Sequence, residues 1–94
     1  MAAYRIDYSR VVSQANDIDG LAESLSSEIL KLENLLAQVK QEWHGPASTA
    51  FQVQLTKLIN DMQATKDSMS SVSCTIKDAA KQIQREDEKN AEKD

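Results

Sequence analysis

Four consecutive residues, Trp43-His44-Gly45-Pro46, separate two long runs in which apolar residues recur at helical spacing. The chain has two glycines and one proline, and these four residues hold one of the glycines and the proline. Glycine tolerates the left-handed conformation that ends a helix, and proline suits the first position of the next helix. We therefore expect Trp43 to be the last core residue of one helix, His44 and Gly45 to form the turn, and Pro46 to begin a second helix. Helices joined by so short a turn run antiparallel.

The run before the turn predicts one long helix. Its apolar residues alternate between steps of three and four, which is the heptad spacing of a helix that packs along one seam. Asp7 is expected to cap the first turn, because its carboxylate can accept hydrogen bonds from free backbone N–H groups. Gly20 does not end the run, because the spacing continues in phase on both sides of it. The apolar residues at this spacing form one stripe along the predicted helix, here called the first stripe. It consists of Tyr4, Tyr8, Val11, Ala15, Ile18, Ala22, Leu25, Ile29, Leu32, Leu36, Val39 and Trp43.

The run after the turn has the same spacing and predicts a second helix of similar length. The apolar residues stop after Ile83, and residues 85–94 are almost all charged or polar, so we expect a disordered tail there. The predicted organisation is a flexible N-terminus at 1–7, a hairpin domain at 8–84 with its turn at 43–47, and the tail. The second stripe consists of Ser48, Phe51, Leu55, Leu58, Met62, Thr65, Met69, Val72, Ile76, Ala79 and Ile83.

The predicted fold class is all-α, an antiparallel two-helix hairpin. Two helices cover each other along one seam only, and a chain of 94 residues with this shape has little core of its own. The one cysteine, Cys74, cannot form an intrachain disulfide. We therefore expect hairpins to dimerise into a four-helix bundle. The candidates for the second contact surface are the apolar residues beside the seam, Leu21, Leu30, Leu35 and Ile59.

Composition and motifs argue against an enzyme, a nucleic-acid-binding protein and stable membrane insertion. The formal net charge is −4, and no run of lysine or arginine is present. The single histidine, His44, has no cysteine or carboxylate at ligand spacing, and no nucleophile motif or phosphate loop occurs, so neither metal nor cofactor is expected. No segment is apolar enough to span a bilayer, and the N-terminus lacks the apolar core of a signal peptide. Cys74 is interpreted as a small filler near a helix interface, with an intermolecular disulfide as the alternative.

The residues at the turn resemble a known family. Trp43-His44-Gly45 matches the Trp-x-Gly signature of the WXG family, the small helical-hairpin proteins of the type VII (ESX) secretion system. The similarity extends to Ala47 and Phe51, which follow the wider family pattern around the turn. By motif the resemblance covers residues 43–51. By architecture it covers the whole chain, because the signature lies at mid-chain between two heptad helices in a sequence of about the family's length.

The resemblance implies a protein partner and a pathway of export from the cell. The chain would pair with itself, as in many Gram-positive members, or with a related hairpin protein. It would be made in the cytoplasm, exported as a folded dimer by the type VII machinery, and act as a secreted effector or as the co-secreted partner of a larger toxin. The alternatives are a targeting adaptor for a toxin with an N-terminal helical domain, a cytoplasmic coiled-coil scaffold, and a needle-like hairpin that polymerises through heterologous contacts. A membrane-disrupting effector rests on family analogy alone.

The family also has an export signal on the second helix, a tyrosine followed four residues later by an acidic residue. This chain departs from that pattern, because no tyrosine follows Tyr8. The nearest counterpart is Ile83 with Asp87, which lie one turn apart on one face. Either the signal is degenerate here, or a partner chain supplies the tyrosine. In a head-to-tail dimer the turn of one copy would approach the tail of the other, which would place Trp43 and Gly45 beside Asp87.

Overall fold

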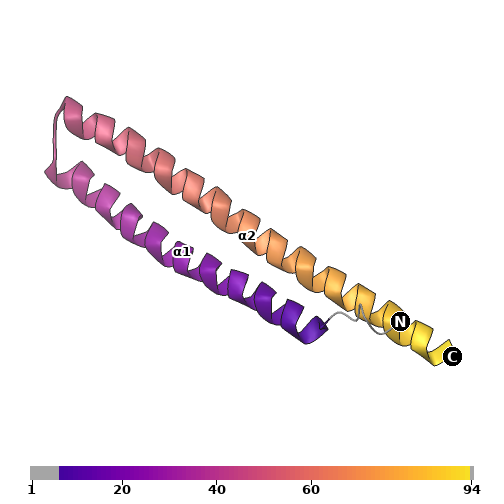
Figure 1. Ribbon diagram of the computed structural model, residues 1–94. Coiled ribbons are helices and arrows are strands. Elements are labelled where there is room, and N and C mark those ends of the chain that lie inside the picture. The colour runs from indigo at the N-terminus through magenta and orange to yellow at the C-terminus, as the bar shows by residue number, and fades with distance from the viewer. Residues whose placement is uncertain (1–6, 94) are drawn as a thin grey trace.

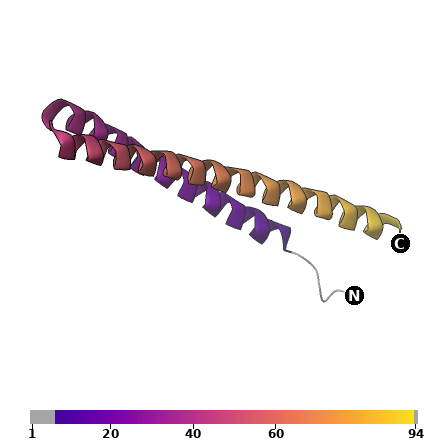
Figure 2. The same cartoon turned by 90° about the horizontal axis from the view of Figure 1, so that it is seen from above.

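The chain forms two long antiparallel helices in the computed structural model, which describes residues 7–93 (Figure 1). Helix α1 spans Tyr8–Glu42, 35 residues, and α2 spans Pro46–Lys93, 48 residues. Together they make a rod of 74 × 18 × 15 Å, and a second view shows the helices crossing at a shallow angle (Figure 2). The predicted all-α hairpin is confirmed for the described range. The expectation of a flexible N-terminus lies, for residues 1–6, outside that range.

Helix α1 begins where the sequence predicts. The backbone N–H of Arg10 donates a 3.1 Å hydrogen bond to the carboxylate of Asp7, and the N–H of Val11 reaches the carbonyl of the same residue at 3.1 Å. Asp7 is therefore the N-cap: its carboxylate supplies a partner for one N–H that the first turn would otherwise leave free, and its carbonyl accepts the first bond within the helix. The helix also continues through Gly20, as the uninterrupted apolar spacing predicts.

At the turn, Gly45 and Pro46 have the roles that the sequence predicts. Gly45 has a φ of +117°, a conformation that side chains disfavour, and Pro46 is the first residue of α2. The prediction that Trp43 is a core residue is wrong, because its side chain is 46% exposed. Trp43 is the C-cap of α1 with an extended backbone, φ −118° and ψ 117°. That conformation takes its side chain out of the helical stripe, although its N–H still bonds the carbonyl of Val39 at 2.9 Å.

The core differs between the two halves of the rod. In the half next to the turn, Ile29, Leu55 and Ile59 are buried together, and larger side chains pack against them. In the open half, near the other ends of the helices, the buried residues are small. They are Ala15, Ala22, Ser73 and Ala80. The half near the turn therefore contributes most of the buried apolar surface within one hairpin.

The buried stripe of α2 is shifted from the predicted one. Both Leu58 and Ile59 satisfy the step of three or four between Leu55 and Met62, so spacing alone cannot choose between them. The structure buries Ile59, at 6% exposed, and leaves Leu58 48% exposed. Ile59 therefore belongs to the core between α1 and α2, and its assignment to a second contact surface is corrected.

The same choice recurs along α2. At two later steps the hairpin buries the residue one position after the predicted one, so Ser73 replaces Val72 and Ala80 replaces Ala79. The stripe chosen from apolar character missed this, because Ser73 is polar and Val72 is not. The apolar residues that the hairpin leaves outside become available for other contacts.

Helix α2 also continues beyond the predicted end of the hairpin domain. The sequence predicts disorder at 85–94, whereas the helix runs to Lys93. Seven of the ten residues at 85–94 are Glu, Lys, Arg or Ala, which have high intrinsic helix propensity. A helix that is already nucleated extends at little cost through such residues, so the charged composition does not end it.

Candidate functional site

The residues of the turn motif gather at one end of the rod. The rings of Trp43 and Phe51 pack with their centroids 5.6 Å apart and their planes tilted by 53°. Both side chains are partly exposed, as are Gly45 and Ala47. The motif thus forms an accessible aromatic end, because Phe51 lies one and a half turns into α2 and meets the tryptophan that α1 presents at its C-cap.

A buried serine, Ser48, links the two helices at this end by a hydrogen bond. The hydroxyl of Ser48 donates a 2.6 Å hydrogen bond to the carbonyl of Trp43, and the side-chain amide of Gln52 donates to that hydroxyl at 3.2 Å. Ser48 therefore satisfies a carbonyl at the end of α1 from the first turn of α2. Ser48 belongs to the predicted stripe of the second helix, but the apolar spacing alone does not predict this role for a polar residue. The sequence feature that could have predicted this hydrogen bond is the position of Ser48 directly after Pro46-Ala47, in the first turn of the second helix.

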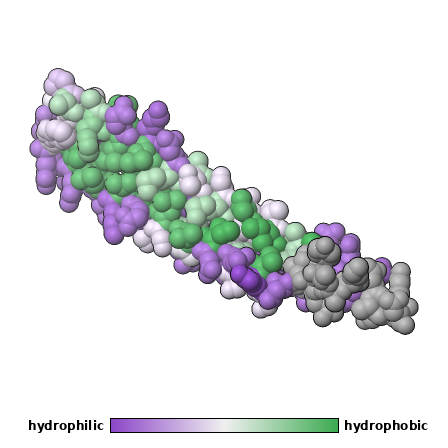
Figure 3. Space-filling view, viewed as in Figure 1, coloured by the Kyte–Doolittle hydropathy of each residue, from purple (hydrophilic) through white to green (hydrophobic). Residues whose placement is uncertain are grey.

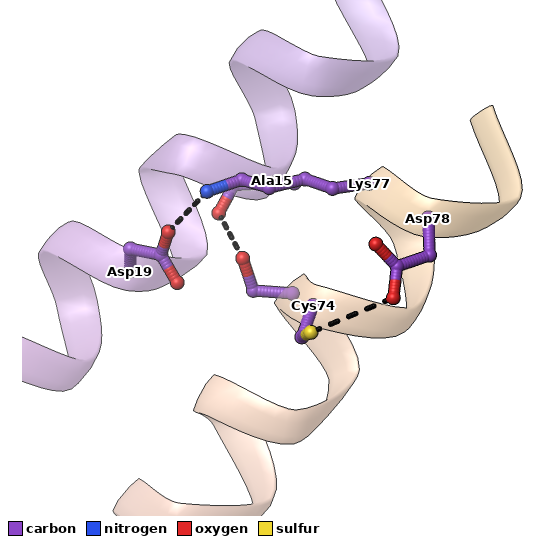
Figure 4. Close-up of polar contacts among 6 residues, drawn as sticks. Ala15, Asp19, Cys74, Lys77 and Asp78 are labelled. Carbon is purple, nitrogen blue, oxygen red and sulfur yellow. Dashed lines mark hydrogen bonds and ion pairs between the residues drawn. The ribbon is translucent and has the colours of Figure 1, made fainter. Parts of the chain in front are cut away.

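On one side of the hairpin, here called the polar side, contacts between polar side chains join α1 to α2. Lys77 donates to Asp19 at 2.6 Å, and Gln63 donates to Glu33 at 3.4 Å. Beside these contacts the buried hydroxyl of Ser73 donates to the carbonyl of Ala15 at 2.9 Å. Figure 4 shows Lys77 reaching across from α2 to Asp19 on α1. The Lys77 ammonium, and after it the Ser73 hydroxyl, hold the pKa of the Asp19 carboxyl below its ordinary value.

The opposite side is mostly apolar, and none of the cross-helix contacts just described lies on it. Five exposed residues of α2 follow one another at intervals of seven, and we call them the α2 strip. They are Phe51, Leu58, Thr65, Val72 and Ala79. Beside the middle of the strip lies a shallow apolar hollow, which Ile18 of α1 lines together with Met69 and Val72 of α2. Figure 3 shows a band of apolar residues running along one face of the rod between hydrophilic borders.

The apolar candidates on α1 divide between the two sides. Helical geometry places Leu21 and Leu35, two heptads apart, on the side of Ile18, and both are exposed. Leu30 is equally exposed but falls on the side of Asp19. The apolar side of the hairpin therefore consists of the α2 strip together with Ile18, Leu21 and Leu35.

The proposed export residues lie at the open end of the rod. Ile83 and Asp87 are one turn apart on α2, and Ile83 is exposed. The hydroxyl of Tyr8, in the first turn of α1, donates a hydrogen bond to the carboxylate of Asp87. The fold thus brings a tyrosine from the other end of the sequence to the acidic residue, which linear spacing could not reveal. In one chain this end lies at the opposite end of the rod from the turn between α1 and α2 (Figure 1).

The remaining candidates have simple surroundings. Cys74 is exposed, so its interpretation as an interface filler is wrong. Its thiol lies 3.7 Å from the carboxylate of Asp78 (Figure 4). His44 is exposed at the turn. Across residues 7–93 the structure has no cluster of three or more His, Cys, Asp or Glu that could hold a metal ion. Neither of the two helices, as far as they are described, has a stretch apolar enough to cross a membrane.

The fold and the turn define a class, the small helical hairpins with a Trp-x-Gly turn. The chain belongs to the WXG100 family, described as proteins of 100 residues with WXG, which it matches over residues 3–88. The ESAT-6-like proteins EsxB of Mycobacterium bovis and of Mycobacterium tuberculosis are each 24% identical to it over 88 residues, 94% of this chain and 88% of theirs. No solved structure matches the chain. The family resemblance inferred from the turn is confirmed.

Proposed function

We propose that this chain is a non-enzymatic protein exported by the type VII (ESX) secretion system, paired with a second helical hairpin through its apolar side. The observation that carries the proposal is the contrast between the two sides of the rod. One side is closed by polar contacts such as Lys77 to Asp19, while the other exposes the α2 strip. The family and the relatives named ESAT-6-like proteins support the link to ESX export.

The apolar side fits another hairpin better than a small molecule or a membrane. Its exposed residues recur every seven positions along α2, which is the spacing by which one helix packs against another. The hollow beside Thr65 is shallow and open, unlike the enclosed pockets that hold ligands. A second hairpin laid along this side would bury the strip and complete a four-helix bundle.

Recognition by the export machinery is assigned to the ends of the rod. Ile83 presents an exposed apolar side chain, Asp87 presents a carboxylate one turn later, and Tyr8 adds an aromatic ring beside that carboxylate. The tyrosine that the family places four residues before the acidic residue is here supplied by α1 of the same chain. The Trp43–Phe51 aromatic end supplies the second element. Once outside the cell, the paired protein acts as an effector or as the co-secreted partner of a larger toxin.

Secretion of variants tests this proposal. Trp43→Ala and Asp87→Asn should each abolish export from a host with the secretion system, while circular dichroism and solution mass remain those of the parent. The matched controls are His44→Ala beside the tryptophan and Glu88→Gln beside the aspartate, and both should be exported normally. Normal export of both Trp43→Ala and Asp87→Asn would rule out these ends as the recognition elements.

A further inference from the structure

We infer that the cross-helix contacts in the open half of the hairpin position its export element, the contact of Tyr8 with Asp87. The positioning residues are Ser73, Lys77 and Asp19, because their contacts align α1 with α2. Their role rests on the proposed function of Asp87 in export. It adds a condition to that function, because the export element is complete only while the open half is closed.

The export element depends on how far α1 is displaced along α2. Ala15 contacts Ser73, and seven residues further out on each helix Tyr8 is therefore close to the level of Ala80. Side chains lean toward the N-terminus of their own helix, so in this antiparallel pair Tyr8 leans toward the open end and Asp87 leans toward the turn. The two side chains meet across this offset. A slip of α1 by one helical turn, about 5.4 Å, would separate them beyond hydrogen-bond distance.

Apolar packing does little to prevent such a slip in the open half. Among residues 74–89 of α2, Ala80 is the one residue that is buried, and it offers only a methyl group. Larger apolar side chains in this region, such as Ile76 of α2 and Val11 of α1, are only half-buried. Small or half-buried side chains interlock weakly, because few of their atoms are enclosed by neighbours. The alignment in this half must therefore come from directional polar contacts.

Two contacts of different direction supply this alignment (Figure 4). The hydroxyl of Ser73 is 1% exposed as part of its residue, so breaking its bond to the carbonyl of Ala15 would leave a buried donor without a partner. Lys77 lies one turn nearer the open end than Ser73. Its partner Asp19 lies one turn nearer the hairpin turn than Ala15, so their 2.6 Å contact runs obliquely between the helices. A slip of α1 in either direction therefore breaks at least one of the two contacts.

The positioning residues act at a distance from the export element. Ser73 precedes Asp87 by 14 residues, about 21 Å along a helix, so it acts through the alignment of α1. When the first turns of α1 separate from α2, Asp87 keeps Ile83 one turn before it on the same helix but loses the ring of Tyr8. The export machinery would then meet a complete element on a closed hairpin and an incomplete one on an opened hairpin.

Reversing the charges of the ion pair tests the positioning role in the full chain. Asp19→Lys and Lys77→Asp each place two like charges opposite each other. In both variants amide hydrogen exchange between Val11 and Ala15 should become about five-fold faster or more, since at least one hydrogen bond that closes the open half is lost. Most of the secretion should be lost as well. The double variant Asp19→Lys with Lys77→Asp restores a pair of opposite charges, so it should recover both slow exchange and secretion.

A general loss of stability needs its own control. Ile29→Val removes one methyl group from the buried cluster near the turn. It should destabilise the protein to a similar degree, but neither speed up exchange in the first turns of α1 nor reduce secretion. Asp17→Lys makes the same charge change as Asp19→Lys at an exposed position on the same helix, and it should be secreted like the parent.

The two readouts separate the possible failures. Unchanged exchange in the single variants, or a double variant that behaves like them, would overturn the positioning role of the ion pair. Faster exchange with normal secretion, in a host that fails to export Asp87→Asn, would also overturn the positioning role, while the proposed function would stand. Normal secretion of Asp87→Asn would instead overturn the proposed role of this end in export, together with the positioning role that depends on it.

Discussion

The hydroxyl of Ser73 on α2 donates a 2.9 Å hydrogen bond to the backbone carbonyl of Ala15 on α1, and the two residues are among the least exposed in the hairpin. One helix thus bonds the backbone of the other in the open half of the rod, where the buried side chains are too small to fix the alignment by packing. The cross-helix bond supplies this alignment, and the adjacent Lys77–Asp19 pair repeats it one turn along each helix.

Replacing Ser73 measures the strength of this bond. Ser73→Ala should lower the free energy of unfolding by about 1 kcal/mol, the usual net worth of one hydrogen bond. Ser73→Val should cost more, about 1–3 kcal/mol, because its extra methyl group must fit at a position that is 1% exposed. Urea denaturation at one fixed protein concentration compares them, since the stability of an oligomer depends on concentration. A larger loss for alanine than for valine would contradict the tight fit inferred here.

The Lys77–Asp19 contact predicts a dependence of stability on pH. Lys77, chiefly, lowers the pKa of Asp19 in the folded state. The contact therefore stabilises the fold above about pH 4, where the unfolded chain also has an ionised carboxylate, and this contribution disappears as pH falls through the lowered pKa. Asp19→Asn should be less stable than the parent near neutral pH, and the difference should close as the pH falls through the lowered pKa of Asp19.

The matched control for this titration is Asp17→Asn, an exposed carboxylate on the same helix. Both variants are unfolded by urea at a series of pH values, with the parent alongside. The difference in free energy of unfolding between parent and variant should depend on pH more steeply for Asp19→Asn than for Asp17→Asn. A gap for Asp19→Asn that stays constant down to pH 2 would show that the contact does not alter the ionisation of Asp19.

The two glycines should respond in opposite directions to the same substitution. Gly20 lies within α1, and a methyl group there would meet nothing within 4 Å, so Gly20→Ala should stabilise the protein by about 0.5–1 kcal/mol through helix propensity. Gly45 has space around it as well, but its φ of +117° is strained for alanine. Gly45→Ala should therefore destabilise by about 1–3 kcal/mol. Thermal denaturation of both variants at equal concentration makes the comparison, and changes of the same sign would refute it.

The sequence predicted the elements of the fold and all the residues that α1 buries, but it missed part of the stripe that α2 buries. Asp7, Gly45 and Pro46 signal helix ends through local backbone chemistry, and all three act as predicted. The burial of Ile59 in place of Leu58 depends on how two helices supercoil, and both residues fit the same apolar spacing. The contact between Tyr8 and Asp87 joins positions 79 residues apart. Only the antiparallel fold and the helix lengths bring them together, so no local pattern could predict it.

The distinction between Leu58 and Ile59 leads to the sharpest test of the apolar side. These neighbours are similar in size and chemistry, yet one lies in the hairpin core and the other in the α2 strip. Ile59→Ala should lower the free energy of unfolding by about 2–5 kcal/mol, because it leaves a cavity between α1 and α2. Leu58→Ala removes a half-exposed side chain, so it should lower the free energy of unfolding of a single hairpin far less.

Leu58→Ala should instead act on association. In the proposed four-helix bundle the α2 strip would be buried between hairpins. Losing the leucine should therefore shift the dimer toward the monomer in a dilution series followed by light scattering, while helical content by circular dichroism stays near that of the parent. Ile59→Ala should lose helical content and association together, because the surface that pairs depends on the core beneath it. If Leu58→Ala dimerised as tightly as the parent and Ile59→Ala dissociated without loss of helix, Ile59 would lie at the contact between hairpins and Leu58 outside it.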